Sequence, residues 1–288
     1  MTKGSGLSEL KWALITGASG GIGYEFARQL AEQGRNVILV ARRQDRLLQI
    51  ANALAMKYGV GTHTIAADLS TKEGLEAVLC QTRNYWVDTL INNAGREESG
   101  PFLSLETADL IQSIALNCKA PLVLSHQLGK RMAEEGGGKI LFVSSIVAFQ
   151  GVPLIANYSA TKAYLLTLAE GLAAEFAQHG VKISITAPGF TRTNLSPEIS
   201  FKSVPFKPMT PEFVANYTLK RLGKQRLIIP GSMNKFLYWS GKFLQPRAIN
   251  TRSFGLVFRR VLSQKLLKTG TKTSSAESAP EACRDQPK

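Results

Sequence analysis

The chain has 288 residues, a formal net charge of +14 and 44% hydrophobic residues. This length suits one large α/β domain with a buried sheet. Cys80, Cys118 and Cys283 stand singly in the sequence, which excludes a disulfide framework and a paired-cysteine metal site. No apolar stretch reaches the length that a bilayer span needs.

The first predicted strand, residues 11–16, leads into a glycine-rich turn, Thr16-Gly-Ala-Ser-Gly-Gly-Ile-Gly23, and a helical pattern follows. A turn in this place offers free backbone N–H groups to a phosphate. Gly17 would permit the tight turn, Gly21 would let the backbone approach a pyrophosphate, and Gly23 would let helix and strand pack closely. The spacing is TGxxxGxG and not GxGxxG, so a plain turn is the alternative interpretation.

The second predicted strand, residues 36–41, runs into Arg42 and Arg43. An acidic residue that would bond a ribose 2′-hydroxyl does not follow it. Two cations here favour a 2′-phosphate, so we predict NADP(H) rather than NAD(H) as the cofactor. Arg42 is the stronger candidate because it is nearest to the strand's end. The alternative is that both arginines merely open the next helix on its solvent side.

The remaining chain continues to alternate between strands and helices. Further strands are predicted at 62–67, 88–92, 138–144, 181–187 and 226–229, and the longest helices at about 106–134 and 155–179. This alternation predicts an α/β fold with a doubly wound parallel sheet of about seven strands flanked by helices.

Tyr158 and Lys162 lie four residues apart and therefore project from the same face of the second long helix. An ammonium near a phenol favours the phenolate, so Lys162 is expected to lower the pKa of Tyr158 and make it a general acid or base. An isolated pair at this spacing is usually part of a solvated helix face. The motifs upstream of the pair favour the catalytic interpretation.

Taken together, the motifs resemble those of the short-chain dehydrogenase/reductase family, over residues 10–230. The resemblance rests on the following segments in this order: Thr16 to Gly23, Asp68-Leu69, Asn92-Asn-Ala-Gly95, Asn117, Ser145, Tyr158 with Lys162, and Pro188-Gly189. It implies a single extended Rossmann domain that carries both the cofactor site and the substrate site.

The resemblance also implies catalytic roles for four residues. Tyr158 would be the general acid in carbonyl reduction, and Lys162 would lower its pKa and bond the nicotinamide ribose. Ser145 would bond the substrate oxygen, and Asn117 would hold a water that links Lys162 to solvent. Ser145 is preferred to its neighbour Ser144 because it precedes Tyr158 by thirteen residues, the interval usual in the family.

A cofactor-binding set follows from the same resemblance. Asp68 would bond the adenine amino group with Leu69 against the ring, residues 92–95 would form a backbone wall, and Pro188 to Thr193 would hold the carboxamide. The whole set is Gly17, Ser19, Gly21, Ile22, Gly23, Arg42, Asp68, Leu69, Asn93, Ala94, Gly95, Tyr158, Lys162, Pro188, Gly189, Thr191 and Thr193. Thr191 departs from the aliphatic residue that is usual in the family.

We predict no metal site, because His63, His126 and His179 show no metal-ligand spacing with acids or cysteines. Residues 1–9 form a tail without a long apolar run. A secretory signal is therefore not expected, and a reducing, cytoplasmic location is.

The C-terminal part carries most of the positive charge. Between Phe213 and Ala276 there are thirteen Lys and Arg residues and no Asp or Glu. Residues 231–268 are predicted to form basic amphipathic helices, broken at Pro246, that either cap the substrate pocket or an oligomer seam, or attach to an anionic membrane surface on its inner face. Nucleic acid is not expected as a partner, because no groove-reading motif accompanies the charge. Residues 269–288 are expected to be disordered.

The predicted function is NADP(H)-dependent hydride transfer to or from a hydrophobic carbonyl or alcohol, because the loop at 190–208 is rich in apolar residues. Two alternatives stay open: a non-catalytic NADP(H)-binding sensor or scaffold docked on a membrane, and an epimerase or dehydratase that uses the same tyrosine. By the resemblance, the long helices would pack between subunits of a homodimer or homotetramer.

Overall fold

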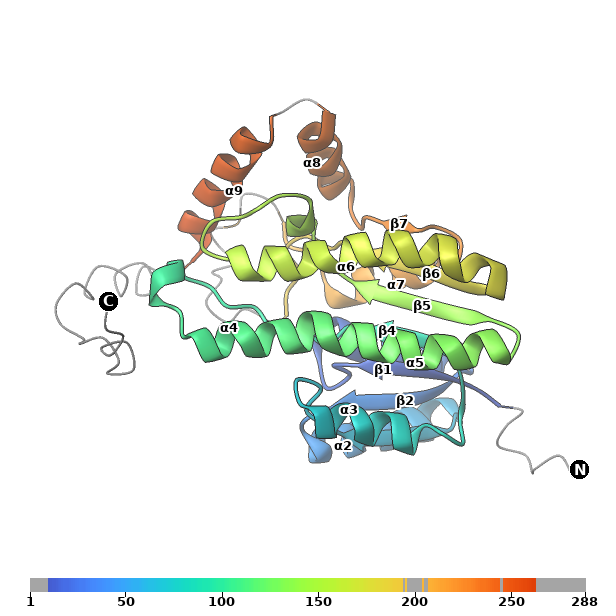
Figure 1. Cartoon of the computed structure of the whole chain (residues 1–288). Coiled ribbons are helices and arrows are strands. Elements are labelled where there is room, and N and C mark those ends of the chain that lie inside the picture. Colours follow the sequence, from blue (N-terminus) through green and yellow to red (C-terminus); the bar gives the residue numbers. More distant parts are fainter. Residues whose placement is uncertain (1–9, 194, 196–203, 205–206, 244–245, 263–288) are drawn as a thin grey trace, which may run out of the picture.

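The computed structural model describes residues 10–193, 195, 204, 207–243 and 246–262. A parallel sheet of seven strands lies at its centre, in the order β3-β2-β1-β4-β5-β6-β7 (Figure 1). The strands are β1 (Lys11–Thr16), β2 (Asn36–Ala41), β3 (Thr62–Ala66), β4 (Trp86–Asn92), β5 (Gly138–Val143), β6 (Val181–Thr186) and β7 (Leu227–Ile228). The predicted doubly wound parallel sheet is confirmed, with each strand within two residues of its predicted ends.

Helices follow the strands in turn, as the sequence predicts. They are α1 (Gly21–Glu32), α2 (Gln44–Tyr58), α3 (Lys72–Gln81), α4 (Thr107–Ile114), α5 (Ala120–Glu134), α6 (Ala156–Glu175), α7 (Pro211–Leu219), α8 (Ser232–Phe243) and α9 (Arg247–Val261). Short 3-10 turns lie at Phe102–Ser104, Ile146–Phe149 and Phe176–His179, and a π-helical turn at Ala115–Lys119 lies between α4 and α5.

Helices cover both faces of the sheet. Alternate residues of each strand point to opposite faces, so each face contributes apolar side chains to a core of its own. In β1, Trp12 and Leu14 pack with residues of α3, α5 and α6. Ala13 and Ile15 point the other way and pack with residues of α1, α2 and α7. Since both sides of a parallel sheet must be buried, the strands read as continuous apolar runs.

The topology places the functional segments together. The strand order reverses between β1 and β4, and in a parallel sheet the carboxyl ends at such a point border a crevice. Every motif singled out in the sequence except the two on helices follows the end of a strand. The fold therefore gathers these segments at one edge.

The C-terminal helices extend beyond the β7 side of the sheet (Figure 1). The predicted break is confirmed, because α8 ends at Phe243 and α9 begins after Pro246. Phe258, Val261 and Leu262 join a cluster of buried residues that includes Ile146 and Tyr158. None of the described helices is long and apolar enough to cross a bilayer. The predicted tails at 1–9 and 269–288 lie outside the described residues.

Candidate active site

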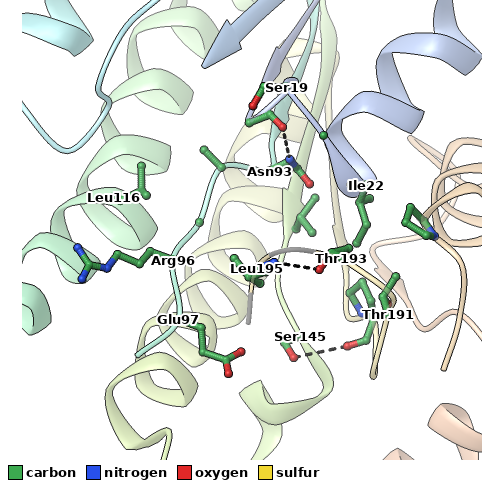
Figure 2. Close-up of a pocket in the computed structure, with 18 of the residues that line it drawn as sticks. Ser19, Ile22, Asn93, Arg96, Glu97, Leu116, Ser145, Thr191, Thr193 and Leu195 are labelled. Atoms are coloured by element: carbon green, nitrogen blue, oxygen red, sulfur yellow. Dashed lines mark hydrogen bonds between the residues drawn. The ribbon is translucent and has the colours of Figure 1, made fainter. Parts of the chain in front are cut away.

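A cleft of about 1230 Å³ lies at the carboxyl ends of the strands. It is lined by the turns that follow β1, β2, β3, β4, β5 and β6 and by residues of α6 and α9. Figure 2 shows how these segments converge, with Ser19 and Ile22 from the first turn facing Asn93 and Thr193. The cleft is large enough for a dinucleotide and a substrate to bind next to each other.

The glycine-rich turn has the backbone that the sequence predicts. Gly17 and Gly21 have φ angles of +68° and +55°, which favour glycine. A Cβ on Gly23 would stand 2.3 Å from the carbonyl oxygen of Gly17, so the helix could not approach the strand as closely with any other residue. Gly23 does not line the cleft, and the structure shows its part in the close packing of helix and strand.

Thr16 connects this turn to the turn after β4, a role that the sequence analysis missed. Its buried hydroxyl accepts hydrogen bonds from the backbone N–H groups of Asn93 and Ala94, both at 2.9 Å, and donates one to the carbonyl of Ile91 at 3.3 Å. The Asn93 amide donates to the Thr16 carbonyl at 2.9 Å. The two walls of the cleft are therefore held at a fixed separation.

Three arginines line the cleft beyond β2. Arg42 and Arg43 come directly after the strand, and Arg46 stands one turn into α2. Arg43 donates to the hydroxyl of Ser19 at 3.4 Å, so its guanidinium reaches the glycine-rich turn. The sequence indicated Arg42 and Arg43, with Arg42 as the stronger candidate, and the structure adds Arg46 to the lining of the cleft. Arg46 lies in the first turn of α2, close behind the two arginines in the sequence, which could have indicated it.

Asp68 and Leu69 line the same end of the cleft. One oxygen of Asp68 accepts hydrogen bonds from the backbone N–H and the hydroxyl of Ser70, at 2.9 and 2.7 Å. Burial raises the pKa of Asp68, but these bonds and the charge of Arg42 outweigh burial and hold the pKa below its usual value. An ionised acceptor at this position suits the amino group of an adenine.

The catalytic candidates on α6 are deeply buried. Tyr158 is 5% exposed and Lys162 is 3% exposed, and the Lys162 Nζ lies 5.5 Å from the centre of the Tyr158 ring. Lys162 also donates to the Val143 carbonyl at 3.0 Å. The Ser145 hydroxyl lines the cleft and hydrogen-bonds Tyr158, whereas that of Ser144 donates to the backbone carbonyl of Lys162 at 2.8 Å. The two serines therefore have separate tasks.

The pKa of Tyr158 is raised, not lowered. Burial is the main cause, and the charge of Glu97 adds to it, while the hydrogen bond from Ser145 acts in the opposite direction. This direction is opposite to the lowering predicted from Lys162, because the burial of Tyr158 itself is the dominant effect. Burial lowers the pKa of Lys162 to about 8. At neutral pH, Tyr158 carries its proton and can donate it.

Asn117 lies in a π-helical turn, Ala115–Lys119, that separates α4 from α5. The sequence predicts one continuous helix here. Pro121 has no N–H to donate to the Asn117 carbonyl four residues earlier, and the N–H of Ala120 bonds the Ala115 carbonyl five residues earlier. The proline that frees this carbonyl is visible in the sequence and could have indicated the interruption.

The Asn117 side chain forms hydrogen bonds through both its amide nitrogen and its oxygen. Its amide nitrogen donates to the Arg96 carbonyl at 2.8 Å and to the Thr161 hydroxyl at 3.0 Å, and its oxygen accepts from the Arg96 N–H at 2.9 Å. A Cβ on Gly95 would lie 3.3 Å from both this oxygen and the Lys162 Nζ. Gly95 therefore leaves room between the Asn117 side-chain oxygen and Lys162, where the predicted water would sit.

The segment from Pro188 to Thr193 closes the opposite wall. The Pro188 carbonyl accepts hydrogen bonds from the Ile146 N–H at 2.8 Å and the Ser145 hydroxyl at 3.5 Å. The Thr191 hydroxyl donates to the Gly189 carbonyl at 2.9 Å. A Cβ on Gly21 would lie 3.2 Å from the Thr193 methyl, so this segment faces the glycine-rich turn. Pro188, Gly189, Thr191 and Thr193 all line the cleft, as predicted.

The substrate side of the cleft is mostly apolar. Ile146, Val147 and Phe190 lie there, and α9 adds Phe254 and Phe258. The rings of Phe190 and Phe258 are 5.5 Å apart, which ties α9 to the wall. The predicted loop at 190–208 is only partly described, and its residues Phe201, Pro205 and Phe206 lie outside the described part of the chain.

The described residues fit NADP(H). Glycines with positive φ open the turn where a pyrophosphate would approach, an arginine cluster stands where a 2′-phosphate would lie, and the cleft leads to Tyr158. In the same part of the chain, no three His, Cys, Asp or Glu side chains are grouped so that they could hold a metal ion.

Comparison with known proteins gives consistent matches. Residues 11–203 match the model of a family described as short chain dehydrogenase. The chain is 32% identical over 219 residues to the 3-oxoacyl-(acyl-carrier-protein) reductase of Aquifex aeolicus, covering 73% of this chain and 88% of that relative. It is 29% identical over 219 residues to the very-long-chain 3-oxoacyl-CoA reductase of Bos taurus, covering 75% of this chain and 69% of the relative.

Solved structures agree with these relatives. A 7beta-hydroxysteroid dehydrogenase has a TM-score of 0.78 at 26% identity, covering 85% of this chain and 96% of that one. A short-chain dehydrogenase of Sphingobium yanoikuyae in complex with NADPH has a TM-score of 0.74 at 28% identity, covering 93% of this chain and 99% of that one. The matched family segment contains the glycine-rich turn and the Tyr158 to Lys162 pair.

Proposed function

Because the chain belongs to the short-chain dehydrogenase family, it is an NAD(P)-dependent oxidoreductase that acts on CH–OH groups, and we propose that it reduces a hydrophobic ketone or aldehyde with NADPH. The observation that carries the proposal is the position of the protonated, buried Tyr158 at the end of an apolar cleft. The curated relatives, reductases of 3-oxoacyl groups by name, support a carbonyl on an aliphatic chain.

In the proposed reaction, NADPH would supply, when bound, the hydride that reduces the carbonyl carbon. Ser145 holds the carbonyl oxygen by a hydrogen bond, and Tyr158 transfers its phenolic proton to this oxygen as negative charge develops. Lys162 stabilises the phenolate that is left, because its ammonium lies near the ring. A water between Lys162 and the Asn117 carbonyl would then return a proton towards Tyr158.

A substrate screen tests the proposal. The purified full chain is incubated with NADPH and a panel of ketones and aldehydes whose alkyl chains increase in length, and NADPH oxidation is followed. We expect kcat/KM to rise with chain length, because each buried methylene adds about 0.8 kcal/mol of transfer free energy. A preference for small polar carbonyls would contradict the proposed substrate class. Bound NADPH without any turnover would favour the sensor or scaffold role.

The arginine cluster leads to a prediction on cofactor choice. Arg42→Ala is expected to weaken NADPH binding about tenfold or more while NADH binding changes little, because a charge-assisted hydrogen bond contributes about 1.5–3 kcal/mol. Arg43→Ala should act in the same way, since its guanidinium reaches Ser19. Titrations of each variant with both cofactors measure the effect. Equal losses for NADPH and NADH would show that the arginines do not face a 2′-phosphate.

The outer face of α8 and α9 suits attachment to a membrane, and we propose this as a second property of the chain. Phe236, Trp239 and Phe243 form one exposed stripe on α8, and they are 64%, 56% and 62% exposed. On α9, the exposed Ile249 and Leu256 lie among basic side chains. Apolar residues that can insert and cations that meet lipid phosphates are the features of an interfacial helix.

The two predicted roles of this region are compatible because they use opposite faces. Phe254 and Phe258 of α9 point inward and line the cleft, while Arg252, Arg259 and Arg260 are exposed. A second copy of the chain is a poor partner for the outer face, since the same positive charges would meet each other. We therefore propose the anionic, cytoplasmic face of a membrane as the partner.

Vesicle flotation tests this attachment. The chain should float with vesicles that contain phosphatidylserine, float less with neutral vesicles, and lose binding as salt is raised. The double variant Trp239→Ala/Phe243→Ala should reduce the bound fraction about tenfold or more. Met56→Ala, which removes an exposed apolar side chain from α2, is the matched control and should float like the unmodified chain. Flotation that the double variant does not reduce would contradict the proposal.

The face formed by α4 to α6 supports a proposed homodimer or homotetramer. Exposed apolar side chains of this face include Ile111, Ile114, Leu122 and Tyr164. Their burial between subunits would stabilise an assembly.

A further inference from the structure

Glu97 brings an acidic side chain to the substrate side of the cleft. It follows the turn after β4. The guanidinium of its neighbour Arg96 is directed towards Asp109, whereas Glu97 points into the cleft on the side of Ser145 (Figure 2). The other side chains on this side are mainly apolar, as described above. A carboxylate among them stands close to the place where a substrate carbonyl would be reduced.

The position of Glu97 is fixed from both sides. The backbone of Arg96 is held by Asn117, through bonds of 2.9 Å to its N–H and 2.8 Å to its carbonyl. Glu98 is buried and bonds the Arg96 guanidinium, with 2.9 Å between Nε and Oε1. The Ser99 hydroxyl donates a hydrogen bond to Glu97 Oε1 at 2.9 Å. These contacts therefore hold the Glu97 side chain and the backbone next to it in place.

The charge of Glu97 reaches the catalytic residues. It raises the pKa of Tyr158, after burial, and it raises the pKa of Lys162 against the larger lowering by burial. Tyr158 and Lys162 are buried, so the charge of a nearby carboxylate is screened weakly there. A charged group on a substrate at the same place would experience the same field.

We propose that Glu97 selects substrates by charge, so that the site accepts carbonyl compounds that are uncharged next to the carbonyl and rejects those with a free carboxylate there. An ester, an amide or a plain ketone would fit, and the corresponding free oxoacid would place two carboxylates together in a poorly solvated cleft. This selectivity rests on the proposed reduction of a hydrophobic carbonyl. The apolar lining would select hydrophobic substrates, and Glu97 would in addition select against a carboxylate next to the carbonyl.

Further charged side chains that line the cleft include those of Arg96, Lys162 and Arg192. The Arg96 guanidinium is paired with Glu98 and Asp109, and the Lys162 ammonium donates to Val143. Arg192 also lines the cleft and would attract an anion. The binding comparison below distinguishes the effect of Glu97 from that of Arg192.

The test compares methyl 3-oxododecanoate with the free acid 3-oxododecanoate. Calorimetric titration into the full chain saturated with NADP⁺ gives Kd for each, and the ester should bind about tenfold more tightly or better. Glu97→Gln keeps the shape of the side chain and the acceptor for Ser99, and should reduce this ratio about tenfold. Glu73→Gln, an exposed charge on α3, is the control and should leave the ratio unchanged.

The outcomes are distinct. An acid that binds as tightly as the ester, or more tightly, would overturn the proposal and point to Arg192. A ratio that Glu97→Gln does not change would overturn it as well, as would the absence of ester binding. NADPH oxidation with the ester is measured separately and decides the reduction reaction. Charge selectivity without turnover would therefore preserve the role of Glu97 and contradict the proposed function.

Discussion

Replacing Tyr158 by Phe is expected to reduce kcat for carbonyl reduction by about 10³-fold, while the Kd for NADPH stays within about twofold. The change removes one oxygen atom, the proposed proton donor, and leaves the ring in its buried cluster with Ile146, Val147 and Phe258. A carbonyl oxygen that gains negative charge in this cleft would then have no acid to protonate it. Steady-state NADPH oxidation and a fluorescence titration of NADPH measure the two quantities.

Tyr164→Phe is the matched control for this variant. Tyr164 lies on the same helix, but it is 38% exposed and does not line the cleft. It loses the same atom, so kcat should remain close to that of the unmodified chain. Full turnover by Tyr158→Phe would contradict the acid role of this residue, and equal losses in both variants would indicate a general effect on α6.

The second large effect is expected for Lys162→Met, which should remove activity and at the same time stabilise the fold at neutral pH. Burial lowers the pKa of Lys162 to about 8 from an ordinary 10.5. Between these two values the unfolded chain binds more protons than the folded chain, so the free energy of unfolding rises with pH. Below about pH 8 the full cost of burying the charge is present, about 3 kcal/mol.

Methionine removes this cost but leaves the Val143 carbonyl without its donor, which costs about 1 kcal/mol. We therefore expect Lys162→Met to be about 2 kcal/mol more stable at pH 7, and this gain should shrink as pH rises towards 10.5. Urea unfolding at several pH values measures it. The exposed Lys130 on α5 provides the control Lys130→Met. A Lys162→Met variant that is less stable at pH 7 would show that burial does not penalise this lysine.

Much of the fold could be predicted because it depends on local sequence. The apolar runs specify the strands, and the turn from Gly17 to Gly23 marks where a strand gives way to a helix. Pro246 likewise ends one amphipathic pattern and begins another, and the structure places the break between α8 and α9 there. In each case, neighbouring residues determine the backbone.

The features that were missed depend on contacts between distant segments. The pKa of Tyr158 was predicted from its neighbour Lys162 alone, but its direction is determined by burial beneath α9 and by Glu97. The hydroxyl of Thr16 meets its partners 75 to 78 residues along the chain. No periodicity in the sequence reports such contacts, because they form only when the sheet brings strand ends together.

The central claim is that this chain reduces a hydrophobic carbonyl with NADPH. Its most direct test is to incubate the full chain with NADPH and methyl 3-oxododecanoate, and to measure both the NADPH consumed and the 3-hydroxy ester formed. We predict that one molecule of hydroxy ester forms for each NADPH oxidised. Binding of NADPH without consumption, or conversion of the substrate without a change in the cofactor, would contradict it.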